Sequence, residues 1–255
     1  MNIVIPMAGR GSRFQDVGYT SPKPLIDVDG QKMIEAVVKN LKPECDHQFV
    51  FICLKEHFEK YNLNDLFKSI AEDKFKVALS DGVTEGAACT CLLAKEYINN
   101  AEPLIIVNSD QIILDLDLRH ILTFSQVNEC DGVVGAFLSS SKKNSYVKLG
   151  EDLSIADVKE KIVISNFATN GLHFWSKGTY FVESAEEMIK NNDRYNNEFY
   201  VAPTYNYLIK NGKKILPFFF NLHFPIGTPE DLKIYLGHRQ KILWDKNKNK
   251  YYECL

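Results

Sequence analysis

The chain lacks the features that mark several large classes of protein. It has no surplus of basic residues, because 30 Lys and Arg stand against 33 Asp and Glu and give a formal net charge of -3. We therefore expect neither nucleic acid nor an anionic membrane as a partner. Its apolar runs have the length of strands, far short of a membrane span. The first run, 3–5, is too short for a signal-peptide core and has no basic flank before it, so we expect a cytoplasmic protein.

Cysteine is present without the spacing of a metal site. The chain has six cysteines, and none of them forms a Cys-x-x-Cys pair, which argues against bound zinc. We expect all six to remain reduced, in keeping with a cytoplasmic location. The chain also lacks repeats, low-complexity tracts and any stretch that resembles a linker.

Length and periodicity predict one α/β domain. The 255 residues can bury a large core. Short apolar runs alternate with segments of helical period, which predicts a doubly wound, mostly parallel, Rossmann-like mixed sheet flanked by helices. The expected strands are 3–5, 49–54, 75–79, 104–107, 132–138, 145–158, 163–175 and 214–219, and the expected helices are 31–41, 56–71, 86–97, 117–124, 179–190, 199–210 and one from Pro229.

The most specific pattern follows the first strand. Residues 3–5 run into the segment Ala8-Gly9-Arg10-Gly11-Ser12-Arg13. Two glycines this close let the backbone turn sharply and present its N–H groups to a ligand. Arg10, Arg13 and Lys23 add three cations around that backbone. Amide donors together with fixed cations favour a polyphosphate ligand.

This loop differs from two better-known phosphate loops. It lacks the Gly-x-x-x-x-Gly-Lys-Ser/Thr spacing of a Walker A motif, and Phe14 stands where a dinucleotide fingerprint has its third glycine. Together with Pro22-Lys23-Pro24-Leu25, it resembles the opening of the sugar nucleotidyltransferase family, also called nucleoside-diphosphate-sugar pyrophosphorylases. The resemblance implies that Arg13 and Lys23 are catalytic, and that the nucleotide is bound by Met7, Ala8, Gly9, Gly11, Ser12 and Arg13.

Two further nucleotide-side residues are expected before the middle of the chain. Asp110 ends the apolar run that begins at Leu104, and an aspartate just past a central parallel strand points into the ligand crevice. Its hard oxygens suit Mg²⁺, and the resemblance implies that it holds the metal. Gly86, with Ala88, matches the small residues that let a base lie against the backbone in the family, although a plain helix start explains them as well.

The second half carries an expected acceptor site. The segments Val158-Lys159-Glu160-Lys161 and 165–174 resemble the family's second conserved region. By that match Glu160 binds acceptor hydroxyls, Lys161 binds the acceptor phosphate, and Gly171 permits a close approach of the acceptor. Glu198 stands at the place of a further family glutamate. We therefore expect a nucleotide-binding half over about 1–140 and an acceptor-binding half over about 141–255, sharing one sheet in a single domain, 1–255.

Three positions depart from the family pattern. Ile162 replaces a proline after Lys161, Val147 replaces a glycine that touches the sugar ring, and Pro225 replaces a second metal-binding aspartate. Either one carboxylate with phosphates and water suffices for the metal, or a neighbour substitutes for the missing one. The candidate neighbours are Asp115, Glu230 and Asp231.

The pattern as a whole predicts an Mg²⁺-dependent nucleotidyltransferase. It would join a nucleoside triphosphate to a phosphorylated small-molecule acceptor, with a sugar 1-phosphate as first choice, release pyrophosphate, and supply a precursor of a capsule or other surface polysaccharide. One alternative is a CTP-dependent cytidylyltransferase acting on a non-sugar phosphate, such as a phospho-amino acid, phosphoglycerate or amino-alcohol phosphate. The other is a catalytically silent regulatory protein that binds a nucleotide sugar. The base and the acceptor stay open, and so does a homo-oligomer, for which Tyr251 and Tyr252 are candidate contacts.

Overall fold

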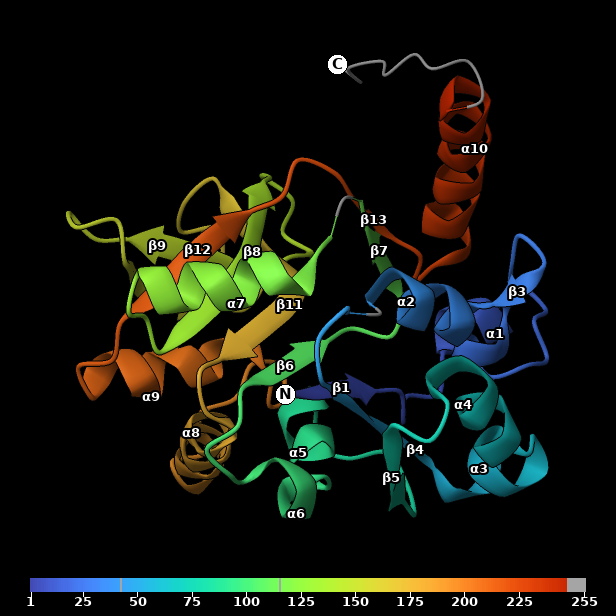
Figure 1. The fold of residues 1–255 in the computed structure, drawn as a ribbon, viewed down its shortest axis with the longest axis horizontal. Coiled ribbons are helices and arrows are strands. Elements are labelled where there is room, and N and C mark those ends of the chain that lie inside the picture. Colours follow the sequence, from blue (N-terminus) through green and yellow to red (C-terminus); the bar gives the residue numbers. More distant parts are fainter. Residues whose placement is uncertain (42, 115, 247–255) are drawn as a thin grey trace.

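The computed structural model describes residues 1–41, 43–114 and 116–246, with side chains up to residue 239. A nine-stranded sheet runs through it in the order β10-β9-β11-β6-β1-β4-β5, and β8 and β12 continue from β11 (Figure 1). Its strands are β1 (Asn2–Pro6), β4 (Gln48–Leu54), β5 (Phe75–Ser80), β6 (Leu104–Val107), β8 (Gly132–Leu138), β9 (Tyr146–Leu149), β10 (Ile155–Lys159), β11 (Phe167–Trp175) and β12 (Ile215–Phe219).

The strands of the first half are parallel, as their alternation with helices predicts. β1 lies between β4 and β6 and is parallel to both, and β5 adds to β4 in the same direction. β11 then joins this block antiparallel to β6 and also pairs antiparallel with β8, to which β12 is parallel. The predicted mixed sheet is confirmed, and β11 is the strand that connects the two halves.

Helices cover both faces of the sheet because successive side chains of its strands point to opposite sides. Ile3 and Ile5 belong to one apolar cluster, which includes residues of α2, α4 and α7. Val4 belongs to another, which includes residues of α5, α6, α8 and α9. Figure 1 shows α2 and α7 on one side and α5, α6 and α8 on the other. These helices are α2 (Met33–Leu41), α4 (Leu63–Ala71), α5 (Ala87–Leu92), α6 (Lys95–Ile98), α7 (Leu118–Val127), α8 (Gly178–Lys190) and α9 (Tyr205–Lys210).

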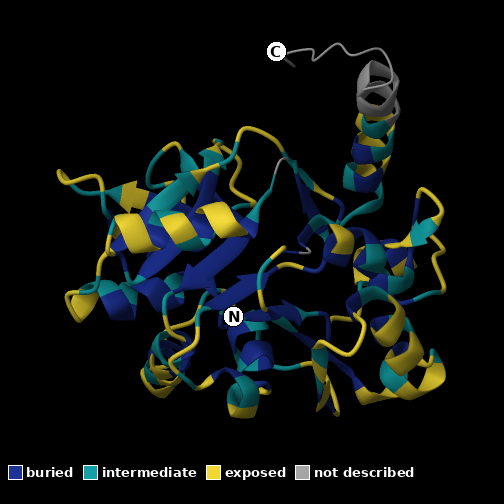
Figure 2. Cartoon of the chain, in the orientation of Figure 1, coloured by how far each residue is buried: buried dark blue, intermediate teal, exposed yellow. Residues whose placement is uncertain are grey.

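Burial follows the same arrangement. The sheet strands form the dark, buried centre in Figure 2, and exposed residues lie along the outer faces of the helices. The doubly wound prediction is therefore confirmed. Among the described residues, no helix combines the length and the apolar character needed to cross a membrane.

Several predicted boundaries were wrong in detail. The strand expected over 145–158 is a hairpin of β9 and β10, because residues 150–154 form a turn closed by the Gly150 N–H donating to the Ser154 carbonyl at 2.8 Å. The helix expected over 86–97 is divided into α5 and α6. The helix expected over 199–210 is a short 3₁₀ turn (Ala202–Thr204) followed by α9.

The last helix begins where predicted. α10 (Pro229–Lys246) starts after Thr228, whose hydroxyl accepts a hydrogen bond from the Asp231 backbone N–H at 3.1 Å and donates to the Asp231 carboxylate at 2.7 Å. This is a side-chain cap at the start of the helix. Just before it, β13 (His223–Pro225) pairs antiparallel with β7 (Gln111–Ile113), which brings the start of α10 beside the end of β6.

Candidate functional site

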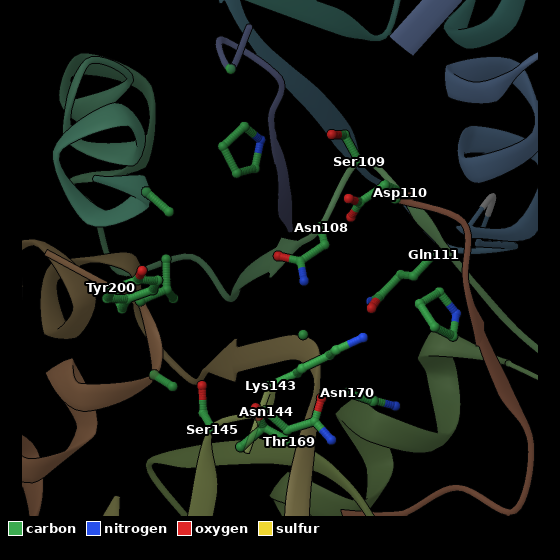
Figure 3. Close-up of a pocket in the computed structure, with 18 of the residues that line it drawn as sticks. Asn108, Ser109, Asp110, Gln111, Lys143, Asn144, Ser145, Thr169, Asn170 and Tyr200 are labelled. Carbon is green, nitrogen blue, oxygen red and sulfur yellow. The ribbon is translucent and has the colours of Figure 1, made fainter. Parts of the chain in front are cut away.

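A cleft of about 960 Å³ opens beyond the carboxyl ends of β1 and β6. That is the usual ligand position in an open α/β sheet, and the volume lies at the upper end for small-molecule sites. Residues of both halves line it. Figure 3 shows the amides of Asn108 and Gln111 facing the amine of Lys143 across its centre.

The glycine loop forms one end of the cleft. Gly11 has φ +68°, a left-handed conformation, and a Cβ built on it would lie 2.8 Å from Cβ of Lys23. Gly11 therefore lets the Pro-Lys-Pro segment pack directly against the loop. Of the predicted nucleotide-binding residues, Gly11 and Ser12 do not line the cleft, because Lys23 covers the former and the latter starts α1 (Ser12–Gln15). Those that line it are Met7, Ala8, Gly9, Arg13 and Gly86.

Lys23 and Asp110 meet in this end of the cleft. Nζ of Lys23 lies 2.8 Å from Oδ2 of Asp110, and both side chains are about three-quarters buried. The two residues are 87 positions apart in the sequence. Gly227 also borders Asp110, because a Cβ there would lie 2.3 Å from Oδ2. The fold therefore brings the predicted catalytic cation and the predicted metal ligand together from two distant segments, and Gly227 of a third segment packs against Asp110.

The donor set fits a magnesium ion in part. Asp110 presents a carboxylate to the cleft, and Mg²⁺ in nucleotide sites commonly takes one or two carboxylates together with phosphate oxygens and water. Pro225 lines the cleft and contributes no side-chain oxygen. Of the proposed substitutes, Asp231 lines the cleft but binds Thr228, Glu230 does not line it, and Asp115 lies outside the described residues. Within the described ranges, no group of three or more His, Cys, Asp or Glu could hold a metal.

Gly86 serves packing between the halves. It has φ +135°, and a Cβ on it would lie 2.4 Å from the carbonyl oxygen of Phe199. The backbone of Phe199 donates to the Glu85 carbonyl at 2.8 Å and accepts from the Ala88 N–H at 3.0 Å. Gly86 still lines the cleft, but its missing side chain makes room for the protein backbone of the second half, a requirement that the sequence argument did not foresee.

Glu160 lies at the opposite end of the cleft. It is only 7% exposed and accepts a hydrogen bond from the Ser145 hydroxyl. Burial raises the pKa of its carboxyl, against the opposing effects of Ser145 and the nearby Lys161 cation. Glu198 lines the same end and raises the pKa of Glu160 slightly further. Two carboxylates therefore face the space where the acceptor is expected.

Lys161 is held by aromatic neighbours. Its Nζ donates to the Tyr200 hydroxyl at 2.6 Å and lies 4.6 Å from the centre of that ring and 5.9 Å from the ring of Tyr195. It lies 4.0 Å from the Glu160 carboxylate. Burial, followed by the hydrogen bond to Glu198, raises the pKa of Tyr200, so its hydroxyl stays protonated at neutral pH. Sequence reasoning missed Tyr200, although it stands two residues after Glu198.

Gly171 and Val147 differ from expectation. Gly171 lines the cleft with φ +79°, but a Cβ on it would lie 2.2 Å from Nδ2 of Asn108 and 2.9 Å from Oε1 of Gln111, so side chains of the protein occupy the space it leaves. Val147 is fully buried in the core cluster around Val4 and does not line the cleft. Its identity therefore says nothing about the acceptor, and Pro225 remains as the departure that reaches the site.

Comparison with known sequences decides the family. The profile of the family described as nucleotidyl transferase matches residues 3–234. The chain belongs to the nucleotidyl transferase family. Among curated relatives, the bifunctional protein GlmU of Methanocaldococcus jannaschii is 24% identical over 161 residues, which are 63% of this chain and 36% of that protein. The chain thus spans about a third of the length of the curated relatives it matches.

Solved structures share the nucleotidyl transferase fold over most of the chain. The nucleoside-diphosphate-sugar pyrophosphorylase of Vibrio cholerae has a TM-score of 0.79 at 24% identity, covering 92% of this chain and 99% of that one. The inositol-1-phosphate CTP transferase of T. maritima has a TM-score of 0.72 at 20% identity, covering 94% and 96%. At these identities the likeness concerns the fold.

In this member of the nucleotidyl transferase family, several residues that line the cleft were not singled out from the sequence. Asn108, Ser109 and Gln111 flank Asp110, so the end of a buried strand could have indicated them. Lys143 and Asn144 come from the loop before β9, where the sequence reads only as polar. His173 of β11 also lines the cleft. It is 4% exposed, burial lowers its pKa to about 3, and its ring is therefore neutral at the wall of the cleft.

Proposed function

We propose that this chain is an Mg²⁺-dependent nucleotidyltransferase that joins a nucleoside triphosphate to a phosphorylated small molecule, with a sugar 1-phosphate as the first candidate. The observation that carries the proposal is the single cleft that holds a glycine loop, Arg13 and the Lys23–Asp110 pair at one end and Lys161 at the other. Cations at both ends suit two phosphorylated substrates, one bound in each half.

The proposed reaction needs no general base. An oxygen of the acceptor phosphate, already an anion at neutral pH, forms a bond to the α-phosphorus. The bond between the α-phosphorus and the bridging oxygen breaks, and pyrophosphate leaves with the electron pair. Positioning and neutralisation of charge supply most of the catalysis in such transfers.

The residues of the cleft would divide these tasks. The backbone at Gly9 and the guanidinium of Arg13 would bind the β- and γ-phosphates, and Arg13 would stabilise charge on the departing pyrophosphate. Lys23 would lie between the α-phosphate and the acceptor phosphate, which Lys161 would hold. Mg²⁺ bound by Asp110 would neutralise phosphate charge. Lys23 must then exchange its contact with Asp110 for a phosphate when substrates bind.

A second candidate keeps the reaction and changes the acceptor. Pro225 lines the cleft where the family has a metal-binding aspartate, so the site differs from that of usual hexose 1-phosphate enzymes. A CTP-dependent transfer to a non-sugar phosphate is consistent with this change. A structural neighbour named as an inositol-1-phosphate CTP transferase has the same fold. We also propose a cytoplasmic location, from the cysteine pattern, and a role in surface polysaccharide synthesis, which the sequence resemblance implies.

One experiment tests both candidates. Pyrophosphate release is measured with Mg²⁺ for CTP, UTP, dTTP, GTP and ATP, each crossed with a pool of sugar 1-phosphates and a pool of non-sugar phosphates. Turnover in the sugar pool supports the first candidate, and turnover only in the other pool supports the second. Silence everywhere from folded protein that binds a nucleotide would instead support a regulatory role.

Arg13→Ala and Lys23→Ala serve as the matched variants. Each should lower kcat by a few hundredfold, because one lost transition-state donor costs about 3–4 kcal/mol. The fold should persist in both, since neither side chain belongs to the apolar core. Turnover close to that of the wild type in both variants would refute the assignment.

A further inference from the structure

The segment 194–200 joins the acceptor end of the cleft to the nucleotide half. Tyr195 and Glu198 exchange backbone hydrogen bonds of 3.0 and 2.9 Å, and Asn196 and Asn197 between them have φ of +47° and +63°. Asparagine tolerates this left-handed conformation better than most residues. The segment is therefore a tight turn with a defined shape, and Glu198 and Tyr200 from it line the cleft.

The segment is attached to the nucleotide half. Beyond the two backbone hydrogen bonds of Phe199 described above, Nη1 of Arg194 lies 2.8 Å from Oε2 of Glu85. The Arg194 guanidinium also lies 4.2 Å from the centre of the Phe199 ring, which is 1% exposed. Arg194 thus contacts a residue beside Gly86 and the buried ring of its own segment at once.

The far end of the same segment holds Lys161. The Tyr200 hydroxyl accepts a hydrogen bond from Nζ of Lys161, and the Tyr195 and Tyr200 rings both lie within 6 Å of that ammonium. Lys161 itself has φ +53°, an uncommon backbone conformation for lysine. The position of its ammonium therefore depends on neighbours that the turn supplies.

We propose that Arg194 is a positioning residue that fixes Lys161 at the acceptor end by attaching the segment 194–200 to the nucleotide half. The inference rests on the proposed function, because it assigns Lys161 to the acceptor phosphate. Without Arg194, the two backbone hydrogen bonds still anchor Phe199 beside Glu85 and Ala88, but they do not reach the turn over 194–198. Losing Arg194 should thus loosen the turn over 194–198 and shift Lys161 while the fold persists.

A second ion pair offers a matched control. Nζ of Lys95 in α6 lies 2.5 Å from Oε1 of Glu186 in α8, so this pair also joins the two halves. Both side chains are about half exposed, and neither lines the cleft. Lys95→Ala removes one positive charge and one pair between the halves, as Arg194→Ala does, without touching the segment. Exposed pairs contribute little by themselves. Glu85 is also 66% exposed, so the effect expected of Arg194 depends on its packing over the buried Phe199 ring, which Lys95 lacks.

The first measurement uses the full chain without substrate. Hydrogen–deuterium exchange is followed in peptides that cover 194–200 in the wild type, Arg194→Ala, Arg194→Lys and Lys95→Ala. Faster exchange in 194–200 is expected for Arg194→Ala and a smaller increase for Arg194→Lys, which keeps the charge but loses the planar group over the ring. Unchanged exchange in Arg194→Ala would overturn the proposal.

The second measurement uses kinetics. The probes are CTP and UTP with glucose 1-phosphate, inositol 1-phosphate and phosphoethanolamine, taking the pair that the wild type converts fastest. Arg194→Ala should lower kcat/KM for the acceptor by about tenfold. A displacement of 1 Å can cost about a hundredfold in rate, and we expect Lys161 to move by less than that. KM for the nucleotide should change by less than about twofold. In Lys95→Ala, both kcat/KM for the acceptor and KM for the nucleotide should change by less than about twofold.

The outcomes distinguish a failure of the positioning role from a failure of the proposed function. Equal losses toward nucleotide and acceptor, or an acceptor constant unchanged in Arg194→Ala, would overturn the positioning role while the proposed function stands. A wild-type protein that converts none of the pairs in this panel or in the wider pools would overturn the proposed function, and with it the acceptor role of Lys161. The exchange measurement then still decides whether Arg194 holds the segment.

Discussion

Replacing Gly11 by alanine tests whether the glycine loop positions Lys23. The new Cβ would lie 2.8 Å from Cβ of Lys23, and ordinary contact begins near 3.4 Å, so the Pro-Lys-Pro segment must move by about 0.6 Å. A misplacement of 1 Å can cost a hundredfold in rate, so we expect a loss of roughly tenfold to a hundredfold in kcat. The φ of +68° adds about 1–2 kcal/mol of backbone strain.

Gly30→Ala is the matched control for this variant. Gly30 has φ +80° and nothing within 4 Å of a built Cβ, so alanine there causes the strain without the contact. Both variants should lower the unfolding midpoint by roughly 2–8 °C. Only Gly11→Ala should lower kcat for pyrophosphate release. Wild-type kcat in Gly11→Ala, or an equal loss of kcat in Gly30→Ala, would refute the reasoning.

Three further predictions concern the acceptor end and the core. Glu160→Gln should lose acceptor kcat/KM yet keep stability at pH 7. Burial raises the pKa of Glu160 in the folded protein above the ordinary 4.5, so ionisation of Glu160 lowers the stability of the wild type as pH rises from 4.5 through the folded pKa. A large loss of stability in the variant at pH 7 would contradict this. His173 has a folded pKa of about 3 against an ordinary 6.5, so the unfolded state binds its proton first. The free energy of unfolding should therefore fall by up to about 1.4 kcal/mol per pH unit as pH drops below 6.5. In His173→Phe, denaturation curves should no longer show this part of the acid sensitivity. Tyr200→Phe keeps the ring but not the hydrogen bond to Lys161, and should raise KM for the acceptor by about fivefold with KM for the nucleotide unchanged; a matching rise for the nucleotide would argue against a local effect.

The order of strands and helices was predictable because it depends on local periodicity. Buried runs such as 49–54 and 104–107 are apolar at every position, as strands covered on both faces must be. The start of α10 after Thr228 was readable for the same reason, because a cap is a contact between residues three apart. Hairpins and helix breaks, such as those within 145–158 and 86–97, were less readable, since one turn residue decides them.

Motif spacing also pointed to the residues of the cleft, but several physical roles were outside its reach. The sequence suggested that Gly86 and Gly171 leave room for ligands. In the structure the backbone of Phe199 and the side chains of Asn108 and Gln111 fill those spaces. Val147 read as part of the acceptor site and is a core residue.

The sequence by itself determined the fold class and the carboxylate at the end of β6, and it predicted phosphate binding at the first loop. Each depends on residues within one element or one loop. The tertiary structure alone decided that Lys23 meets Asp110, that Tyr200 holds Lys161, and that the segment 194–200 attaches to the nucleotide half. These contacts join positions 39 to 109 residues apart. Their partners are set by how the sheet packs, because side-chain contacts at such separations exist only after the chain has folded.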